Sequence, residues 1–329
     1  MIEFSGKMYN MNGIYKVFID GELVAEQKNK LTLLGRSNAL KTMLGLVPSF
    51  AGSMGIGISS KSNGSSGTYL DMSDLDFSVG RYPITAASLG QNDDEDVLVY
   101  TARITDTSRY SITELGLYSN KLSSNFEADN RIIFNFESGD PLKLSDNTYV
   151  ASTAVGATSS DVIPNFVSDL SNYRIGSSCL RLTEQDSVTF NDSVLDMGYV
   201  APYDSFVLAG YFANNVTVNV TFASASGSAV YGFDPTPNNE TFAAGYKVLS
   251  LEKNQGSGYA AVDWSRITSI TIQHTANATT RLDGLRVKKY KTVDSVEGLV
   301  SRALLNTAIE KPFGSVIDIQ YLLEMQMVM

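Results

Sequence analysis

The chain has 329 residues, of which 43% are hydrophobic and 18% are charged, and its 35 acidic and 25 basic residues give a net charge of −10. This length allows two domains of ordinary size or one large β-rich domain. The acidic balance, with no cluster of Lys and Arg to meet phosphates, excludes nucleic acid as an expected partner. Ser, Thr, Asn and Gly replace part of the usual charged share and favour turns and strand edges, so the composition predicts an all-β class with few helices.

The sequence also bears on where the chain is made. Cys179 is the only cysteine, which excludes a disulfide within the chain. Residues 1–17 contain polar side chains throughout, and no apolar run approaches the length of a membrane span. We therefore expect a chain that is made in the cytoplasm and does not insert into a membrane.

A β-hairpin is predicted near the start of the chain. Residues 15–19 and 23–33 read as strands, and Asp20-Gly21 between them suits the positive φ angles of a tight hairpin turn. A short amphipathic helix is predicted over residues 35–44 from the spacing of its apolar residues. Gly45 is placed to cap the carboxyl end of this helix.

Further strands are predicted over residues 54–58, 75–84, 97–104, 109–118 and 131–136. Pro83 cannot donate a hydrogen bond to a ladder, so its strand is expected at a sheet edge. Residues 97–104 and 109–118 are expected to pair through the turn that joins them. Gly116 in the second of these strands indicates a close approach of a neighbouring backbone.

The composition changes after Glu137, because residues 138–164 are rich in Ser, Thr, Asp and Asn, as at a domain boundary. Short strands follow, the clearest over residues 179–182, 215–222 and 267–272. Their turns contain Gly, Asn and Pro, which predicts a sandwich or jelly roll.

The last part of the chain predicts a helix and a strand. Asp294-Ser-Val-Glu297 has the pattern of a capping box, and the apolar residues behind it, up to Leu304, have helical spacing. Residues 317–324 alternate between apolar and polar side chains and predict a half-buried strand.

Two short sequences, one before and one after residues 138–292, carry a resemblance. Ile112-Thr-Glu-Leu-Gly-Leu-Tyr118 precedes an apolar strand, and Lys311-Pro-Phe-Gly314 precedes Ile317-Asp-Ile-Gln-Tyr321. Together with the expected helix 35–44, the expected strand 54–58 and Leu75 with Arg81-Tyr-Pro-Ile84, this order resembles the amino-terminal domains of bacteriophage tail-fibre and baseplate-associated proteins. The resemblance implies a virion-anchoring, split β-sandwich-like domain with two short helices, made of residues 1–137 and 293–329. In that domain the last strand would pair near residues 112–118.

The middle of the chain, residues 138–292, carries a second resemblance. Residues 174–182, 263–270 and 282–287 resemble the opening, penultimate and last strands of carbohydrate-binding-module jelly rolls. The resemblance implies an inserted jelly roll in which Asp283 is a candidate ligand of a structural calcium ion. It also implies that exposed aromatic rings stack on sugar rings. The candidates in expected loops are Tyr199, Tyr203, Tyr231, Phe233 and Tyr246.

The sequence does not predict an enzyme. His274 is the only histidine, which excludes a two-histidine metal site. No Gly-x-Ser-x-Gly sequence, the motif that carries the nucleophile of serine hydrolases, occurs. A glycosidase needs only two carboxylates brought together in space, and the sequence leaves that alternative open. No catalytic residue is named, and no cofactor other than the candidate calcium ion is expected.

The sequence thus leads to one main hypothesis and its alternatives. The main hypothesis is a non-enzymatic phage virion structural protein of the tail, baseplate or fibre, with an outward-projecting jelly-roll domain. The alternatives are a capsid decoration or head-fibre protein, a glycan-binding adhesion module and a polysaccharide-degrading enzyme. The expected partners are other virion proteins, further copies of the chain, with a trimer as the expected state, and a host-surface glycan.

Overall fold

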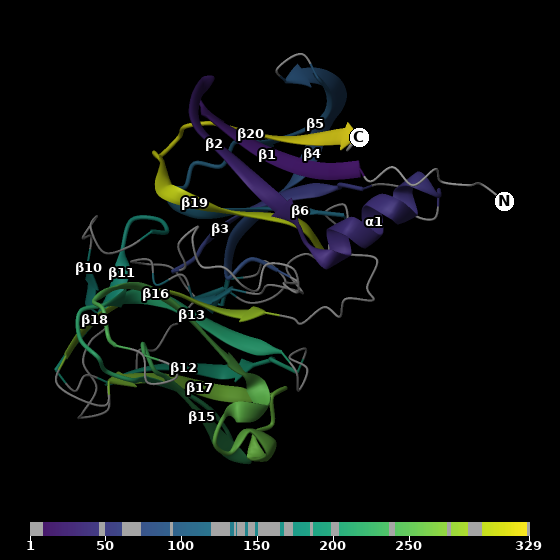
Figure 1. The fold of residues 1–329 in the computed structure, drawn as a ribbon. Helices are drawn as coiled ribbons and strands as arrows, with labels where there is room; N and C mark the ends of the chain where they lie inside the picture. Colours follow the sequence, from purple (N-terminus) through teal and green to yellow (C-terminus); the bar gives the residue numbers. More distant parts are fainter. Residues whose placement is uncertain are drawn as a thin grey trace. The chain divides into compact units, whose positions relative to one another are not determined.

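The computed structural model describes residues 9–45, 50–60, 74–92, 95–119, 132–134, 136, 142–143, 149–150, 165–167, 174–184, 187–198, 204–236, 241–274, 278–288 and 298–327. The chain divides into two compact units. The first unit combines Met1–Ser124 with Lys291–Met329, and the second is Asn125–Tyr290. The expected mainly β fold class is confirmed, since strands dominate both units (Figure 1).

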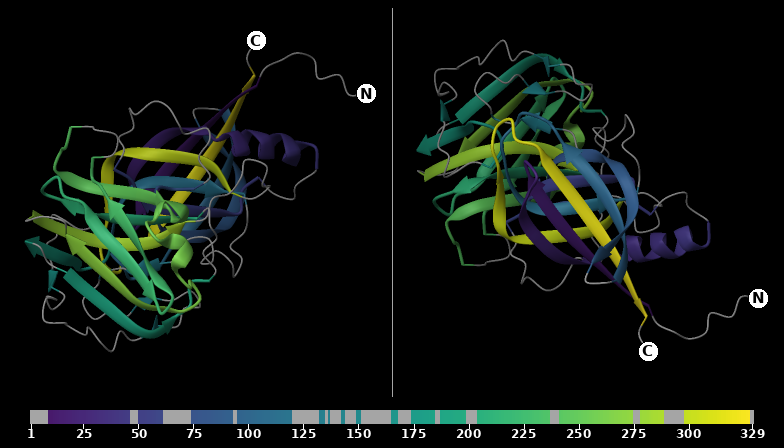
Figure 2. Two further views of the ribbon diagram at one scale, coloured as in Figure 1. Left: turned by 90° about the horizontal axis from the view of Figure 1, so that it is seen from below. Right: turned by 90° about the horizontal axis from the view of Figure 1, so that it is seen from above.

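The first unit is a closed barrel of antiparallel strands. Its strands are β1 (Tyr9–Ile19), β2 (Glu22–Leu31), β3 (Ser53–Ile58), β4 (Phe77–Asn92), β5 (Glu95–Ile104), β6 (Tyr110–Tyr118), β19 (Leu299–Lys311) and β20 (Ile317–Met327). They follow one another around the barrel in the order β1, β2, β19, β6, β3, β4, β5, β20. Strand β20, in yellow, lies beside β1, in purple, so the two ends of the chain close the barrel together (Figure 2).

The two local predictions at the start of the chain are confirmed. Strands β1 and β2 form a hairpin whose turn residues Asp20 and Gly21 have φ angles of 49° and 89°. The helix α1 (Leu33–Met43) begins after Thr32, whose hydroxyl accepts the N–H of Gly35 at 2.9 Å. It ends before Gly45, which has a φ of 70°.

The second helix expected in this unit is wrong, because its residues from Leu299 onward belong to strand β19. The first seven side chains of β19 are all buried, on both faces of the strand. Apolar residues therefore occupy neighbouring positions, and periodicity alone cannot separate such a strand from a buried helix. The capping-box sequence 294–297 lies outside the described residues.

Two expected strand pairings are also wrong. Strand β6 pairs with β3 and β19, and not with β5, the strand before it. The final strand β20 pairs with β1 and β5, whereas the carboxyl-terminal partner of β6 is β19. Strands β5 and β6 are neighbours in sequence but not in the barrel, because β3 and β4 lie between them.

Pro83 pairs with a residue of β3 but with none of β5. It faces Ser53 of β3, whereas the ladder between β4 and β5 begins at Ile84 with a bulge after it. The expected edge position is wrong, because β4 lies between β3 and β5 in the barrel. Pro83 is nevertheless outside the ladder between β4 and β5, so no hydrogen bond of that ladder is lost.

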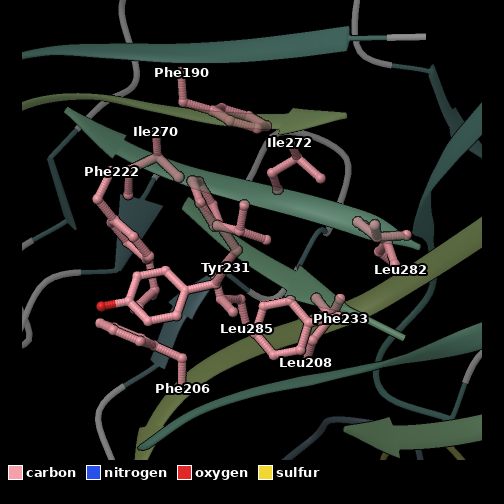
Figure 3. Packing of buried hydrophobic residues seen from close by; sticks show 14 of the residues in the cluster. Phe190, Phe206, Leu208, Phe222, Tyr231, Phe233, Ile270, Ile272, Leu282 and Leu285 are labelled. Atoms are coloured by element: carbon pink, nitrogen blue, oxygen red, sulfur yellow. The ribbon is translucent and has the colours of Figure 1, made fainter. Parts of the chain in front are cut away.

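The second unit is a two-layer β structure. One layer has the order β10 (Asn165–Val167), β11 (Cys179–Glu184), β18 (Ala278–Lys288), β13 (Ser205–Phe212), β16 (Gly245–Glu252), with β7 (Ile132–Phe134) also on β18. The other has the order β12 (Ser187–Leu195), β17 (Ile267–His274), β14 (Val218–Ser224), β15 (Gly227–Phe233). A shared core joins them, as the stacked rings of Phe206 and Phe222 at 4.7 Å show (Figure 3). The unit also contains β8 (Leu142–Lys143), β9 (Tyr149–Val150) and two short 3-10 helices, Lys253–Gln255 and Tyr259–Ala261.

The apolar strand 131–136 was assigned to the anchoring domain, and that assignment is wrong. Strand β7 pairs with β18 through Phe134 and Leu285, and Ile133, Phe134 and Phe136 belong to the core of the second unit. The second unit therefore begins at Asn125, before the change in composition after Glu137. That change follows the first strand of the unit and does not mark its boundary.

Candidate functional site

The sequence Ile112–Tyr118 of strand β6 was the main signature in the sequence, and its side chains lie inside the barrel unit. All nine residues of β6 are buried. Gly116 faces Gly55 of β3, and both glycines leave room for the ring of Tyr118. A Cβ atom on Gly55 would lie 2.8 Å from Cε2 of Tyr118, and one on Gly116 would lie 2.8 Å from Cδ1 of Leu299. The close approach expected at Gly116 therefore involves side chains.

Glu114 is the centre of a buried ion-pair network. Its Oε2 accepts the Nε–H of Arg302 at 2.9 Å, and its Oε1 accepts the backbone N–H of Phe77 at 3.2 Å. The same guanidinium contacts Asp76 at 2.9 Å. Burial alone would lower the pKa of Arg302, but Glu114 and Asp76 outweigh it and hold the pKa above its usual range. The guanidinium is thus charged at all physiological pH values.

Tyr118 is held by a second polar cluster. Its hydroxyl donates to Oδ1 of Asp74 at 2.5 Å, and the guanidinium of Arg81 lies 4.0 Å from the centre of its ring. Arg81 in turn donates from Nε to the hydroxyl of Ser53 at 2.7 Å. Burial, and then the charge of Asp74, raises the pKa of Tyr118 well above its ordinary value. The phenol is therefore a neutral hydrogen-bond donor.

The second signature, Lys311-Pro-Phe-Gly314, lies against the loop that precedes β6. The buried ammonium of Lys311 donates to the carbonyl oxygens of Asp106 at 2.9 Å and Ser108 at 2.7 Å. The N–H of Gly314, which has a φ of 74°, donates to the carbonyl oxygen of Thr107 at 3.2 Å. The two signatures therefore belong to one structural unit.

The candidate site is thus a set of buried ion pairs and hydrogen bonds that link strands and loops of the barrel. The charged atoms of Glu114, Arg302 and Lys311 face protein groups and not solvent, so each needs its partner and β6 and β19 are held in one register. The sequence analysis did not predict that Arg302 and Lys311 make buried polar contacts. The available signal was a charge inside an apolar run, as in Ser301-Arg302-Ala303-Leu304, which is expected to be paired when the run is buried.

A groove of about 450 Å³ lies between strands β2 and β19. The two strands pair only through Leu31 with Ser301 and Lys30 with Arg302. Beyond those pairs the groove is lined by Val24 to Gln27 on one side and by Leu305 to Glu310 on the other. Its lining mixes apolar side chains with amide and carboxylate groups.

The predicted sugar-stacking aromatics lie in different surroundings from those expected. Tyr231 and Phe233 are in strand β15, not in loops, and their rings are buried in the core (Figure 3). The Tyr231 hydroxyl donates to the carbonyl oxygen of Lys253 at 2.6 Å. Tyr246 is partly buried in β16. Tyr199 and Tyr203 lie outside the described residues.

Asp283, the candidate calcium ligand, is buried in strand β18. Its Oδ2 accepts the N–H groups of Arg174 at 2.7 Å and Ile175 at 3.2 Å, and the hydroxyl of Tyr246 at 2.6 Å. The protein thus supplies three hydrogen-bond donors to this oxygen. Across the ranges that the structure describes, no three or more His, Cys, Asp or Glu residues gather in a way that could hold a metal ion. Calcium binding by Asp283 stays a prediction.

His274 and Cys179, the histidine and the cysteine of the chain, are both buried in the second unit. His274 has its Nε2 2.6 Å from the hydroxyl oxygen of Thr280, and Cys179 lies in the interior. No helix in the described part of the chain is long and apolar enough to cross a membrane.

Comparison with known proteins gives little. No protein-family model and no curated protein match the chain. Two solved structures of the VP2 protein of infectious bursal disease virus were found. A subviral particle of VP2 is 10% identical, with 98% of this chain and 81% of that chain covered, at a TM-score of 0.20. A mutant VP2 in T=1 particles is 12% identical, with 98% and 63% covered, at a TM-score of 0.18. At these scores neither likeness carries an argument about fold or function.

Proposed function

We propose that this chain is a non-enzymatic structural protein of a phage virion. In this proposal the barrel attaches the chain to the particle, and the second unit projects outward. One observation supports the proposal: the two sequences that resemble phage tail-fibre and baseplate-associated proteins lie on either side of the second unit in the sequence, and they build one barrel. Arg302 ties β19 to Glu114 of β6, and Lys311 ties the end of β19 to the loop before β6.

The chemistry of the ties supports an anchoring role. A buried ion pair contributes little net stability when it replaces apolar contacts, but losing one partner costs about 3–5 kcal/mol. The Glu114–Arg302 pair therefore penalises alternative registers of β6 and β19. A fixed strand pairing suits a virion protein that assembles once and then carries mechanical force.

The resemblance supports a proposal for the position in the particle. A tail, baseplate or fibre location is proposed first, and capsid decoration is the nearest alternative. The partners proposed are other virion proteins and further copies of this chain. Tyr231 and Phe233 do not support glycan recognition, because they do not present their rings to solvent.

The proposal is tested by purifying particles of the phage that encodes the chain on a density gradient and analysing them by quantitative mass spectrometry. The chain should be present in a fixed ratio to the major virion proteins, and particles made without its gene should lack it and lose infectivity. Recovery of the chain only in the soluble fraction, with unchanged particles, would overturn the proposal. Release of sugar from host envelope by the purified protein would instead favour the enzyme alternative.

A further inference from the structure

Strand β4 extends past its neighbour β3 and leaves one edge exposed. Its ladder with β3 ends at Pro83, opposite Ser53. Its ladder with β5 continues from Ile84 to Asn92, opposite Glu95. Among the residues that the structure describes, no strand pairs with the other edge of Thr85 to Asn92. Residues 85–89 are exposed, and Leu89 is 82% exposed.

This edge lacks the features that usually prevent strands from pairing between molecules. Exposed edge strands commonly carry Lys, Pro or an inward-pointing charge, which block the addition of another strand. The sequence from Ile84 to Asn92 reads Ile-Thr-Ala-Ala-Ser-Leu-Gly-Gln-Asn and has no charged residue and no proline. Its one bulge, between Ile84 and Ala86, lies at the start of the ladder with β5.

The absence of charge makes this edge suited to a second copy of the same acidic chain. The chain has a net charge of −10, so two copies repel each other over most approaches. Like charges directly opposite one another destabilise a pair of strands, and two uncharged β4 edges bring none together. An antiparallel pair of identical strands also satisfies the same main-chain donors and acceptors on both sides, as a twofold interface requires.

We propose that two copies of the chain associate through an antiparallel pairing of β4 with β4, centred near Ser88. In this register Leu89 lies opposite Ala87 of the second copy. Leu89 also faces Leu98 of β5 within its own chain, so the pairing covers the most exposed apolar side chain of β4. The sheet of β20, β5 and β4 then continues into the second copy. The proposal is independent of the assignment to a virion, and it replaces the trimer expected from the sequence by a twofold dimer.

Disulfide trapping tests the geometry directly. Cys179 is the only cysteine and is buried, so a single cysteine introduced on β4 reports contacts without a background. We expect S88C to form a disulfide-linked dimer under mild oxidation, and positions 86, 87 and 89 to crosslink less as they lie farther from the twofold axis. L23C, at a site 53% exposed on β2, is the control and should stay monomeric. No dimer from any of the four β4 variants, or equal dimer from L23C, overturns the proposal.

Charge reversal tests the energetics. The wild-type protein should sediment with about twice the monomer mass of 35.7 kDa. S88E and S88K each place two like charges opposite one another and should raise the Kd of self-association at least about tenfold. An equal mixture of the two variants should regain dimers. V24E, at a site 47% exposed on β2, should associate like the wild type. A monomeric or trimeric wild type, or no rescue by mixing, overturns the proposal.

Discussion

Glu114 can carry a charge in the interior because Arg302 and the N–H of Phe77 surround its carboxylate oxygens. Replacing it by Gln removes one of the two carboxylates that compensate the buried guanidinium, and Asp76 remains as the other. We predict that E114Q lowers the free energy of unfolding of the barrel by about 3–5 kcal/mol. Circular dichroism follows this transition, while the fluorescence of Trp264, the only tryptophan, follows the second unit and should not change.

The matched control for E114Q is E310Q. Glu310 also pairs with an arginine, Arg109, at 3.0 Å, but its side chain is exposed. An exposed ion pair contributes about 0–1 kcal/mol, so E310Q should be nearly silent. Equal effects of the two variants would mean that the Glu114 network is not a determinant of barrel stability.

Tyrosine burial predicts how the barrel responds to alkaline pH. Burial raises the pKa of Tyr321 to about 12, and it also raises the pKa of Tyr15, whose ring lies 4.9 Å away. Below pH 10, where unfolded tyrosines are neutral, these groups leave stability unchanged. Between about pH 10 and 12 the unfolded state loses protons that the folded state keeps, so the free energy of unfolding falls.

The measurement is denaturant unfolding at several pH values for the wild type and for Y321F. The variant should lose stability less steeply above pH 10, because one titrating group is gone. An identical slope in both proteins would show that Tyr321 ionises with an ordinary pKa in the folded barrel.

At the scale of elements, helix α1 depends on one glycine at its contact with β19. A Cβ atom at Gly35 would overlap the carbonyl oxygen of Val300, which cannot move without disturbing the strand. We predict that G35A destabilises the barrel by about 1–3 kcal/mol, despite the better helix propensity of alanine. R36A, at an exposed site on the same helix, should change stability by less than about 0.5 kcal/mol. A more stable G35A would show that α1 does not pack on β19 in this way.

The elements also show which signals in the sequence were sufficient. The β1–β2 hairpin and α1 were predictable because Asp20-Gly21 and Gly45 act through their own backbone conformations. Strand β19 was not predictable, because burial on both faces removes the alternation that distinguishes a strand. The pairing of Glu114 with Arg302 spans 188 residues, and no local pattern encodes it. Tyr231 and Phe233 were placed in loops because the core and the surface of a β structure use the same aromatic residues.

At the scale of the whole molecule, the barrel needs both ends of the chain. Strand β20 pairs with β1 and with β5, so its removal opens the barrel on two sides. We predict that deletion of residues 311–329 unfolds the first unit, as measured by circular dichroism and proteolysis, while Trp264 fluorescence keeps its native transition. A first unit that stays equally stable without these residues would contradict the split barrel.

The second unit should need the residues that precede the change in composition. A fragment of residues 125–290 keeps Ile133, Phe134 and Phe136, which the fragment 138–292 lacks. Removing a buried phenylalanine side chain alone costs about 3–5 kcal/mol. We predict that the shorter fragment is unfolded or at least about 3 kcal/mol less stable, as measured by Trp264 fluorescence in urea. Equal stability would place β7 outside the core.

The most direct test of the central claim is a cryo-electron microscopy map of the particle that is proposed to contain the chain, at a resolution that separates strands. We predict that the barrel of β1–β6, β19 and β20 contacts neighbouring virion proteins, and that the two-layer unit projects away from them. Absence of the chain from the particle, or a particle in which the two-layer unit makes the contacts and the barrel faces solvent, would contradict it.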